Sequence, residues 1–233
     1  NVTNMHGMFI NCEAFNRDLT NWDVSNVTNM SSMFSSAVNF NGDLSGWDVS
    51  SVTTFSSFFF RGFSFNNNSL ANWDMSNGPN LNQMFYGAGQ FNGDISGWDV
   101  SNVTNMRVMF SQTAINQDLS NWDVSSVEDM FGMFERARQF NQDISAWDVS
   151  GATNMAYMFS SANDLADSNK CVIHGSFVQQ NTAWPYEWFD KCDGLTFVPD
   201  DNFEQALIDL EHDDVLDNFI VTADIDSVHF LNL

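Results

Sequence analysis

The stretch FNRDLTNWDVSNVTNMSSMF, residues 15–34, decides the fold because it returns along the chain with small changes. Close copies stand at residues 40–59, 91–110 and 140–159. The tryptophan of this phrase marks the register, and it occurs at Trp22, Trp47, Trp73, Trp98, Trp122 and Trp147. Successive tryptophans are 25, 26, 25, 24 and 25 residues apart. Self-similarity at a nearly fixed period predicts a solenoid, a stack of small units that each contact only their neighbours.

The first part of each repeat is expected to be a short strand. In the spacing Leu19-x-x-Trp22-x-Val24, the tryptophan and the valine point to one face of an extended segment. The residues between and beside them, such as Asp23, point to the other face. We therefore predict a strand of about three to five residues that stacks in parallel with its equivalents.

The second part of each repeat is expected to be a short helix. Four apolar residues follow the i, i+3, i+4, i+7 spacing of one helix face: Met30, Met33, Phe34 and Ala37. Thr28 precedes them as a candidate N-cap. A helix of about two turns is unstable alone in water, so it has to pack on its own strand and on neighbouring coils. The predicted fold class is an α/β, leucine-rich-repeat-like solenoid with one short parallel strand and one short helix in each coil of about 25 residues.

Methionine is concentrated in the predicted helix. Eleven of the twelve methionines occupy two columns of its apolar stripe, and the twelfth, Met75, replaces the strand valine. Thioether side chains suit both irregular cores and adaptable docking grooves. We interpret the methionine and tryptophan columns as core rather than as a groove or a metal site.

The charge of the chain is strongly acidic. Thirty Asp and Glu residues against seven Lys and Arg give a formal net charge of −23. Such a charge excludes nucleic acid and disfavours anionic lipid as a partner, whereas cationic partners, including metal ions, remain. No apolar run is long enough to cross a bilayer, so we expect no membrane span in this sequence.

Two columns of aspartates carry much of this charge. One follows the tryptophans, at Asp23, Asp48, Asp74, Asp99, Asp123 and Asp148, and the other lies near the turns, at Asp18, Asp43, Asp94, Asp118 and Asp143. One interpretation is that Ca²⁺, as the only candidate cofactor, bridges the repelling carboxylates of adjacent coils. The candidate ligands are Asp48, Asp74, Asp99 and Asp123. The other is that each carboxylate accepts backbone N–H groups in its own turn, as Asx motifs do.

A third polar column consists of asparagines, and we expect their side chains to bond backbone groups, as asparagine ladders do in solenoids. Its members are Asn16, Asn41, Asn66, Asn92, Asn116 and Asn141.

Catalytic motifs are absent from the sequence. It contains no H-E-x-x-H, G-x-S-x-G, P-loop or C-x-x-C motif, and its four histidines share no evident partner. A catalytic centre needs a unique constellation, whereas nearly every carboxylate here has several equivalents. We therefore expect a protein that is not an enzyme, and we interpret His174 as a packing residue.

The repeat resembles the leucine-rich repeat, whose L-x-x-L-x-L segment appears here as L-x-x-W-x-V. It resembles more closely the BspA-like family of bacterial surface leucine-rich repeats, with the phrase F-N-x-D-[LI]-S-x-W-D-V-S-x-V-T-x-M-x-x-M-F. The resemblance covers about residues 1–165. It implies an α/β solenoid and an exported bacterial surface protein, commonly an adhesin or a part of one.

A different sequence follows the array and is expected to form its C-terminal cap. The register fails after Leu165, and an open solenoid end would expose apolar surface, so a capping unit is needed. The segment also resembles the end-cap of BspA-like arrays. In an exported protein this resemblance implies a disulfide between Cys171 and Cys192, with Cys12 left as a buried free thiol. The alternative is three reduced cysteines in a cytosolic protein.

The sequence therefore divides into three parts. Residues 1–165 form the solenoid, which begins inside a partial repeat, and residues 166–195 form the cap. Residues 196–233 resemble the entry segment of a second leucine-rich repeat domain, with a helix expected after Asp200 or Asp201 and a strand-like end from Ile225 to Leu233. Because fewer than 40 residues cannot bury an independent core, we expect this chain to be part of a longer multidomain protein.

The third repeat breaks the surface pattern of the array. Aromatic residues and an arginine stand there at Phe60, Arg61 and Phe63, and Tyr86 lies one coil on in the column of Phe60. Exposed aromatics beside an arginine are typical anchors of protein contacts. The alternative is that they fill a local core beneath the longer loop at residues 66–69.

These features predict an extracellular adhesion or protein-recognition module of a larger bacterial cell-surface or secreted protein, with a partner protein on another cell or on the same cell surface. Two alternatives remain: a rigid acidic spacer without a ligand of its own, and the accessory domain of an exported enzyme.

Overall fold

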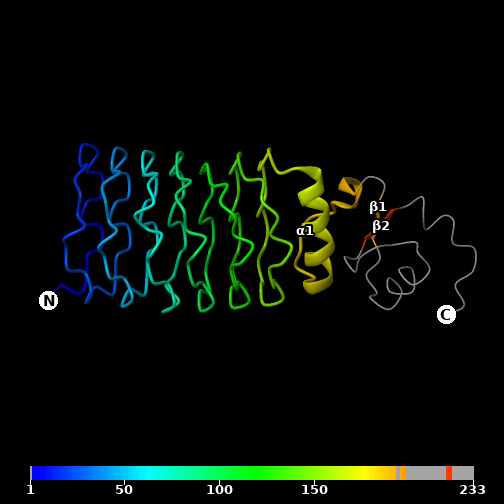
Figure 1. The fold of residues 1–233 in the computed structure, drawn as a ribbon, viewed down its shortest axis with the longest axis horizontal. Coiled ribbons are helices and arrows are strands. Elements are labelled where there is room, and N and C mark those ends of the chain that lie inside the picture. The colour runs from blue at the N-terminus through cyan, green and yellow to red at the C-terminus, as the bar shows by residue number, and fades with distance from the viewer. Residues whose placement is uncertain (1, 193–194, 198–218, 222–233) are drawn as a thin grey trace, which may run out of the picture.

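The computed structural model describes residues 2–192, 195–197 and 219–221. Coils of similar shape lie side by side along the long axis, from the N-terminus to helix α1 (Asp167–Gln180) (Figure 1). Each coil contains a run of turns that we call the turn segment. The turn segments are residues 5–15, 30–40, 55–65, 81–91, 106–115, 130–140 and 155–165.

Each turn segment occupies the place where the sequence predicts a helix, and the structure has successive turns there instead. The Met33 N–H donates to the Met30 carbonyl (3.2 Å), which closes a three-residue turn. Alternate N–H groups leave the coil: that of Met30 donates to Thr54 of the next coil (3.1 Å) and that of Phe34 to Phe58 (2.9 Å). A helix would bond every N–H after its first turn, including that of Phe34, within itself and would leave fewer donors for the neighbouring coil. Successive turns place apolar residues inside every three or four positions, which imitates the spacing of a helix.

Backbone conformation shows why the helix does not form. Ser32 and Ser36 have φ of 56° and 57°, in the left-handed region, and other coils have left-handed residues at the same two places. Each such residue costs about 1 kcal/mol when it is not glycine. The hydrogen bonds that the turned backbone donates to the next coil offset that cost.

The predicted strand at Leu19, Trp22 and Val24 is also formed differently. In the described part of the array, parallel pairing is limited to single-residue bridges that lie further along each coil: Asn4–Asn29, Asn29–Thr54, Thr54–Asn80, Asn105–Asp129 and Asp129–Asn154. The Val27 N–H donates to the Val24 carbonyl (2.8 Å), so the expected strand ends in a turn. The coils are therefore parallel, without a regular strand in residues 2–165.

The core is a set of side-chain columns that run through the coils. Equivalent phenylalanines of successive turn segments stack with ring centroids 5.6–5.8 Å apart, at Phe34, Phe59, Phe85, Phe110, Phe134 and Phe159. The methionines of the two predicted columns are buried beside them from Met30 to Met158. Tryptophans also stack, with Trp98 and Trp122 at 6.3 Å.

The tryptophans join the coils by hydrogen bonds as well as by burial. Each indole N–H donates to a backbone carbonyl of the preceding coil: Trp47 to Leu19 (2.8 Å), Trp73 to Leu44 (3.3 Å), Trp98 to Leu70 (2.8 Å), Trp122 to Ile95 (3.2 Å) and Trp147 to Leu119 (2.8 Å). A buried indole N–H needs a partner, and the stacking of the coils supplies it. Trp22, in the first of these coils, is only partly buried.

The cap consists of α1 and the short 3-10 helix η1 (Phe189–Lys191), joined by the Cys171–Cys192 disulfide that the family resemblance implies. Cys12 is free, but it is half-buried rather than buried as predicted. Its coil is the first described one and contacts another coil on one side only, whereas the equivalent Ala37 lies between two coils and is fully buried.

Beyond the cap, β1 (Leu195–Phe197) pairs with β2 (Phe219–Val221) in an antiparallel two-stranded sheet, with Thr196 opposite Ile220. The helix expected after Asp200 and the strand expected at residues 225–233 lie outside the described residues.

Candidate binding surface

The aspartate column that follows the tryptophans forms Asx turns, the second of the two interpretations of the sequence. The Asp74 carboxylate accepts hydrogen bonds from the Ser76 hydroxyl (2.5 Å) and the Ser76 N–H (2.9 Å). The same pair of bonds recurs at Asp23, Asp48, Asp99 and Asp123. In the second column, the carboxylates from Asp43 onward accept the N–H two residues further on, as Asp143 does from Ser145 (2.8 Å). Local turn bonds therefore account for the repeated Asp-x-Ser spacing.

These bonds also favour the charged form of the carboxylates. The hydroxyl and then the backbone N–H of Ser76 hold the pKa of Asp74 below its ordinary value. The same cause lowers the pKa of Asp123 through Ser125 and that of Asp148 through Ser150. A hydrogen bond to the ionised form stabilises it, so the local turns themselves favour the charged form of Asp74, Asp123 and Asp148.

The candidate calcium ligands Asp48, Asp74, Asp99 and Asp123 stand one to a coil. Within residues 2–192, no group of three or more His, Cys, Asp or Glu side chains is arranged to hold a metal ion. The structure thus places these four aspartates in a column without bringing them together into a cluster.

The asparagine column forms the ladder that its repetition predicts. Each side-chain oxygen accepts the N–H of the equivalent residue in the next coil: Asn16 from Asn41, Asn41 from Asn66, Asn66 from Asn92, Asn92 from Asn116, Asn116 from Asn141 and Asn141 from Ala166. These distances are 2.8–2.9 Å, so the asparagines have a structural role.

Four residues that the sequence singles out for protein contact lie together on the turn segments. We call Phe60, Arg61, Phe63 and Tyr86 the aromatic patch. The rings of Phe60 and Tyr86 stack with centroids 5.0 Å apart, and the Arg61 guanidinium lies 5.2 Å from the Phe60 ring centre. Phe63 and Arg61 are exposed, Phe63 by 52%, whereas Phe60 and Tyr86 are half-buried.

The local-core alternative for this repeat applies to other residues. Phe55, Phe58, Phe59 and Phe65 are fully buried within the stack. The aromatic run of the third repeat therefore divides into core rings and rings at the surface.

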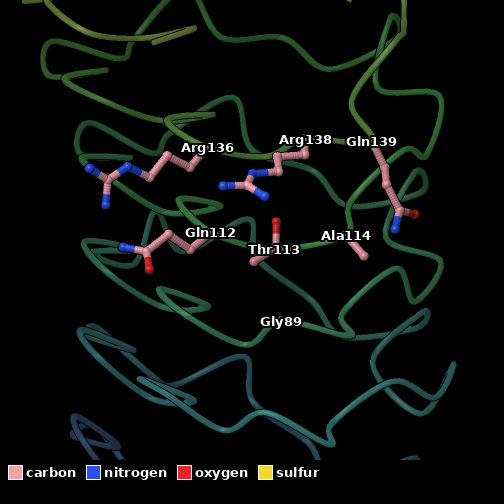
Figure 2. A pocket seen from close by; sticks show the side chains of 7 residues that line it. All are labelled: Gly89, Gln112, Thr113, Ala114, Arg136, Arg138 and Gln139. Carbon is pink, nitrogen blue, oxygen red and sulfur yellow. The ribbon is translucent and has the colours of Figure 1, made fainter. Parts of the chain in front are cut away.

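A second feature, which no sequence motif marks, lies next to the patch. Seven residues line a hollow of about 370 Å³ that we call the arginine hollow: Gly89, Gln112, Thr113, Ala114, Arg136, Arg138 and Gln139. Figure 2 shows the Arg138 side chain extending above Thr113 to the same side as Arg136, with Gln139 on the opposite side and Gly89 at the far edge. Two of the seven cationic side chains of the chain meet here.

The hollow lies where one coil is a residue shorter than the others. From Phe34 to Asn41 the chain advances seven positions, but from the equivalent Phe110 to Asn116 it advances six. The shortened segment includes Ala114. Gly89 of the preceding coil adds no side chain to fill the space.

Direct contacts join the patch to the hollow. The Gln112 amide donates to the Tyr86 hydroxyl (2.7 Å). The Phe63 ring covers Gly89, where a Cβ would lie 2.6 Å from a ring carbon. The two features form one continuous surface across four successive turn segments.

The other residue considered for chemistry, His174, is a packing residue in the cap. Its Nδ1 accepts the Trp184 indole N–H (2.9 Å), and its ring meets Phe189 edge-on with centroids 4.1 Å apart. Burial holds the pKa of His174 below its ordinary value, so the imidazole is neutral at physiological pH.

Residues 1–77 and 60–171 match the family described as "Mycoplasma protein of unknown function, DUF285". The matches cover more than half of the chain, which therefore belongs to this family. No curated protein and no solved structure gives a significant match. Within the described residues, no helix has the length and apolar character needed to cross a membrane.

Proposed function

We propose that this protein is a non-catalytic protein-recognition module of an exported bacterial surface protein, and that its array is related to the BspA-like leucine-rich repeats. The aromatic patch is the observation that carries the proposal. In other coils the column of Phe60 and Tyr86 holds serine three times, at Ser35, Ser111 and Ser160, and otherwise Ile10 and Glu135. Aromatic and arginine side chains at the surface of a rigid scaffold are the residue types that dominate protein interfaces.

Two further observations support this proposal. The Cys171–Cys192 disulfide suits an oxidising, extracellular compartment. The aspartates and asparagines that repeat in every coil are used in turns and ladders, which leaves the positions that differ between coils as the candidates for recognition.

The proposal is tested by returning the patch to the pattern of the array. The double variant Phe60→Ser and Tyr86→Ser carries residues that other coils already accept at this column, so the stack should remain folded. We expect saturable binding of the wild-type protein to intact host or neighbouring cells, and a loss of about tenfold or more in affinity for the variant. Biolayer interferometry on isolated cell-surface proteins then identifies the partner.

Tyr157→Ser is the matched control, because Tyr157 is 60% exposed on a turn segment outside the patch. It should bind as the wild type does. Equal losses for both variants, or unchanged binding of the double variant, would contradict the role of the patch.

The continuous ladders favour a second candidate function, that of a rigid acidic spacer. A spacer predicts no saturable partner on any cell surface. The same binding measurement on the wild-type protein therefore separates the two functions.

A further inference from the structure

The arginine hollow interrupts a row of backbone hydrogen bonds. In this row the Ser64 N–H donates to the Val38 carbonyl (3.0 Å), the Gln90 N–H to Phe63 (3.2 Å) and, past the hollow, the Asp164 N–H to Arg138 (3.1 Å). The row needs a backbone peptide group in the coil of Thr113, where one residue is missing.

The gap leaves two backbone groups without their usual partners. Among the described residues, neither the Gly89 carbonyl nor the Gln139 N–H has a hydrogen-bond partner. Both residues line the hollow. An incoming amide that donates to the first and accepts from the second would restore the row, as an added strand does at a sheet edge.

Charge adds a second requirement. The Arg138 guanidinium forms no ion pair with any described residue, and Arg136 meets only Glu135, at 3.8 Å and largely in solvent. By contrast, Arg107 lies 3.9 Å from the Phe131 ring centre and pairs with Asp129. Guanidinium groups bind carboxylates through two parallel hydrogen bonds. The hollow therefore offers unpaired donors to an anion within a chain of net charge −23.

The remaining polar groups favour a ligand that both donates and accepts. The Thr113 hydroxyl is already used, because it donates to the Phe110 carbonyl (2.7 Å) and accepts from the Ile115 N–H (3.4 Å). One N–H of the Gln112 side-chain amide donates to Tyr86, which leaves its second N–H as a donor and its oxygen as an acceptor. A volume of about 370 Å³ fits a terminal residue or two rather than a long segment.

From these observations we infer that the arginine hollow binds the free C-terminal carboxylate of a peptide chain, with the last amide of that chain taking the place of the missing peptide group. The inference rests on the proposed recognition function and names the class of partner, a protein or peptide that presents its C-terminus. The aromatic patch then contacts the residues that precede the terminus.

The test uses the acetylated tetrapeptide Ac-Gly-Ala-Gly-Ala with a free C-terminal acid, and the same peptide with a C-terminal amide. Isothermal titration calorimetry on the full chain should show saturable binding of the acid and about tenfold or weaker binding of the amide. In amide NMR spectra, the Gln139 N–H should shift on titration with the acid. Acetate and glucuronate, as a simple anion and a sugar acid, should bind more weakly than the peptide acid.

Two variants probe the two requirements separately. Arg138→Gln should weaken binding of the peptide acid about tenfold and leave the amide peptide unchanged. Insertion of one asparagine between Ala114 and Ile115 restores the usual length of the segment and should abolish binding. The control Arg107→Gln removes an arginine outside the hollow and should bind as the wild type does, and the melting temperature reports whether each variant is folded.

Several outcomes would overturn the inference. The peptide acid could fail to bind, or it could bind no more tightly than the amide peptide, acetate or glucuronate. The insertion variant could also be folded and still bind the peptide acid. Should the peptides fail while Phe60→Ser and Tyr86→Ser still abolish cell binding, the recognition function stands and only the hollow loses its role. Peptide binding without any cell-surface partner would instead contradict the recognition function.

Discussion

The interior coils and the last coil of the stack pair equivalent backbone N–H groups with different acceptors. Between interior coils the edge meets another backbone: the Phe110 N–H donates to Met133 (2.9 Å), and the Phe134 N–H donates to Met158 (2.8 Å). At the C-terminal junction the equivalent Phe159 N–H donates to the Tyr186 hydroxyl (2.7 Å). A single side chain in the cap thus replaces the carbonyl of a further coil.

The cap repeats this substitution along the rest of the edge. Gln180 accepts from the Val149 N–H (2.8 Å) and donates to the Trp147 carbonyl (3.1 Å), and Asn181 donates to the carbonyls of Val149 and Ala152 (both 2.6 Å). A coil edge therefore needs donors and acceptors in the right order, whichever part of the chain supplies them. Interior coils combine this hydrogen bonding with stacked rings. A substitution there should therefore lower the free energy of unfolding more than one at the cap does.

The largest expected effect is at an interior junction. Trp98→Ala should lower the free energy of unfolding by about 3–5 kcal/mol, because it leaves a cavity between coils and removes the indole hydrogen bond to the Leu70 carbonyl. Chemical denaturation measures the change. Trp22→Ala is the matched control, since Trp22 is only partly buried, and it should cost clearly less. Equal losses for the two variants would contradict the account of the core.

The next effect concerns the covalent link of the cap. The double variant Cys171→Ser and Cys192→Ser should lower stability by about 3 kcal/mol, because the disulfide closes a loop of 21 residues in the unfolded chain. Thermal melting of the oxidised wild type, the reduced wild type and the variant measures it. Reduction should have no effect on the variant, and Cys12→Ser should melt as the wild type does.

A smaller effect should appear at Tyr186, which links the cap to the last coil. Tyr186→Phe removes the acceptor of the Phe159 N–H and should cost about 1 kcal/mol at neutral pH. Burial raises the pKa of Tyr186 to about 12. Because the folded-state pKa exceeds that of the unfolded chain, the stabilisation is complete below about pH 10 and is lost as the pH rises toward 12.

Denaturation at several alkaline pH values checks this dependence. The wild type should lose stability between about pH 10 and 12 more steeply than Tyr186→Phe does. Parallel curves for the two proteins would show that the phenol is not the group responsible.

The smallest effect should be found in the Asx turns at the surface. Ser76→Ala removes the hydroxyl that donates to Asp74, so the pKa of Asp74 should rise toward its ordinary value. Stability should change by less than about 1 kcal/mol at neutral pH. Since the folded-state pKa is lowered, the stabilisation is present at neutral pH and is lost as the pH falls through the carboxylate range.

Carboxylate titration by NMR gives the pKa directly. Ser64→Ala, whose hydroxyl lies outside the aspartate columns, should leave the pKa of Asp74 unchanged. A pKa of Asp74 that stays the same in Ser76→Ala would contradict the turn geometry.

Sequence periodicity predicted the stack, its register and its asparagine ladder, because these depend on which residues recur. It did not predict the local backbone. Met30, Met33, Phe34 and Ala37 have helical spacing, yet the left-handed Ser32 between them turns the chain so that N–H groups reach the next coil. The spacing of apolar residues shows which side chains face inward. It does not show whether a backbone N–H donates within its own coil or to the next one.

The candidate surface was predicted in part. The aromatic patch could be found from sequence because Phe60 and Tyr86 are the two aromatic residues of a column in which serine is the commonest residue. The arginine hollow depends on Gly89, Ala114 and Arg138, which come from three coils and share no motif. Its one signal in the sequence is the 24-residue interval between Trp98 and Trp122, one residue shorter than the usual 25.

The direction of the inter-coil bonds limits how copies of this protein can associate. Along the turn segments most inter-coil N–H groups donate toward the C-terminal side, as that of Ser32 does to Ser56 (2.9 Å), whereas a few, such as that of Ser64 to Val38 (3.0 Å), donate toward the N-terminal side. Two identical ends brought together by a two-fold axis would place most of these donors against donors, so backbone pairing favours head-to-tail extension, the arrangement that produces open filaments. Gln180, Asn181 and Tyr186 occupy one of the two faces that such an extension needs. By covering this face, the cap also prevents a second copy from stacking on the C-terminal end of the array.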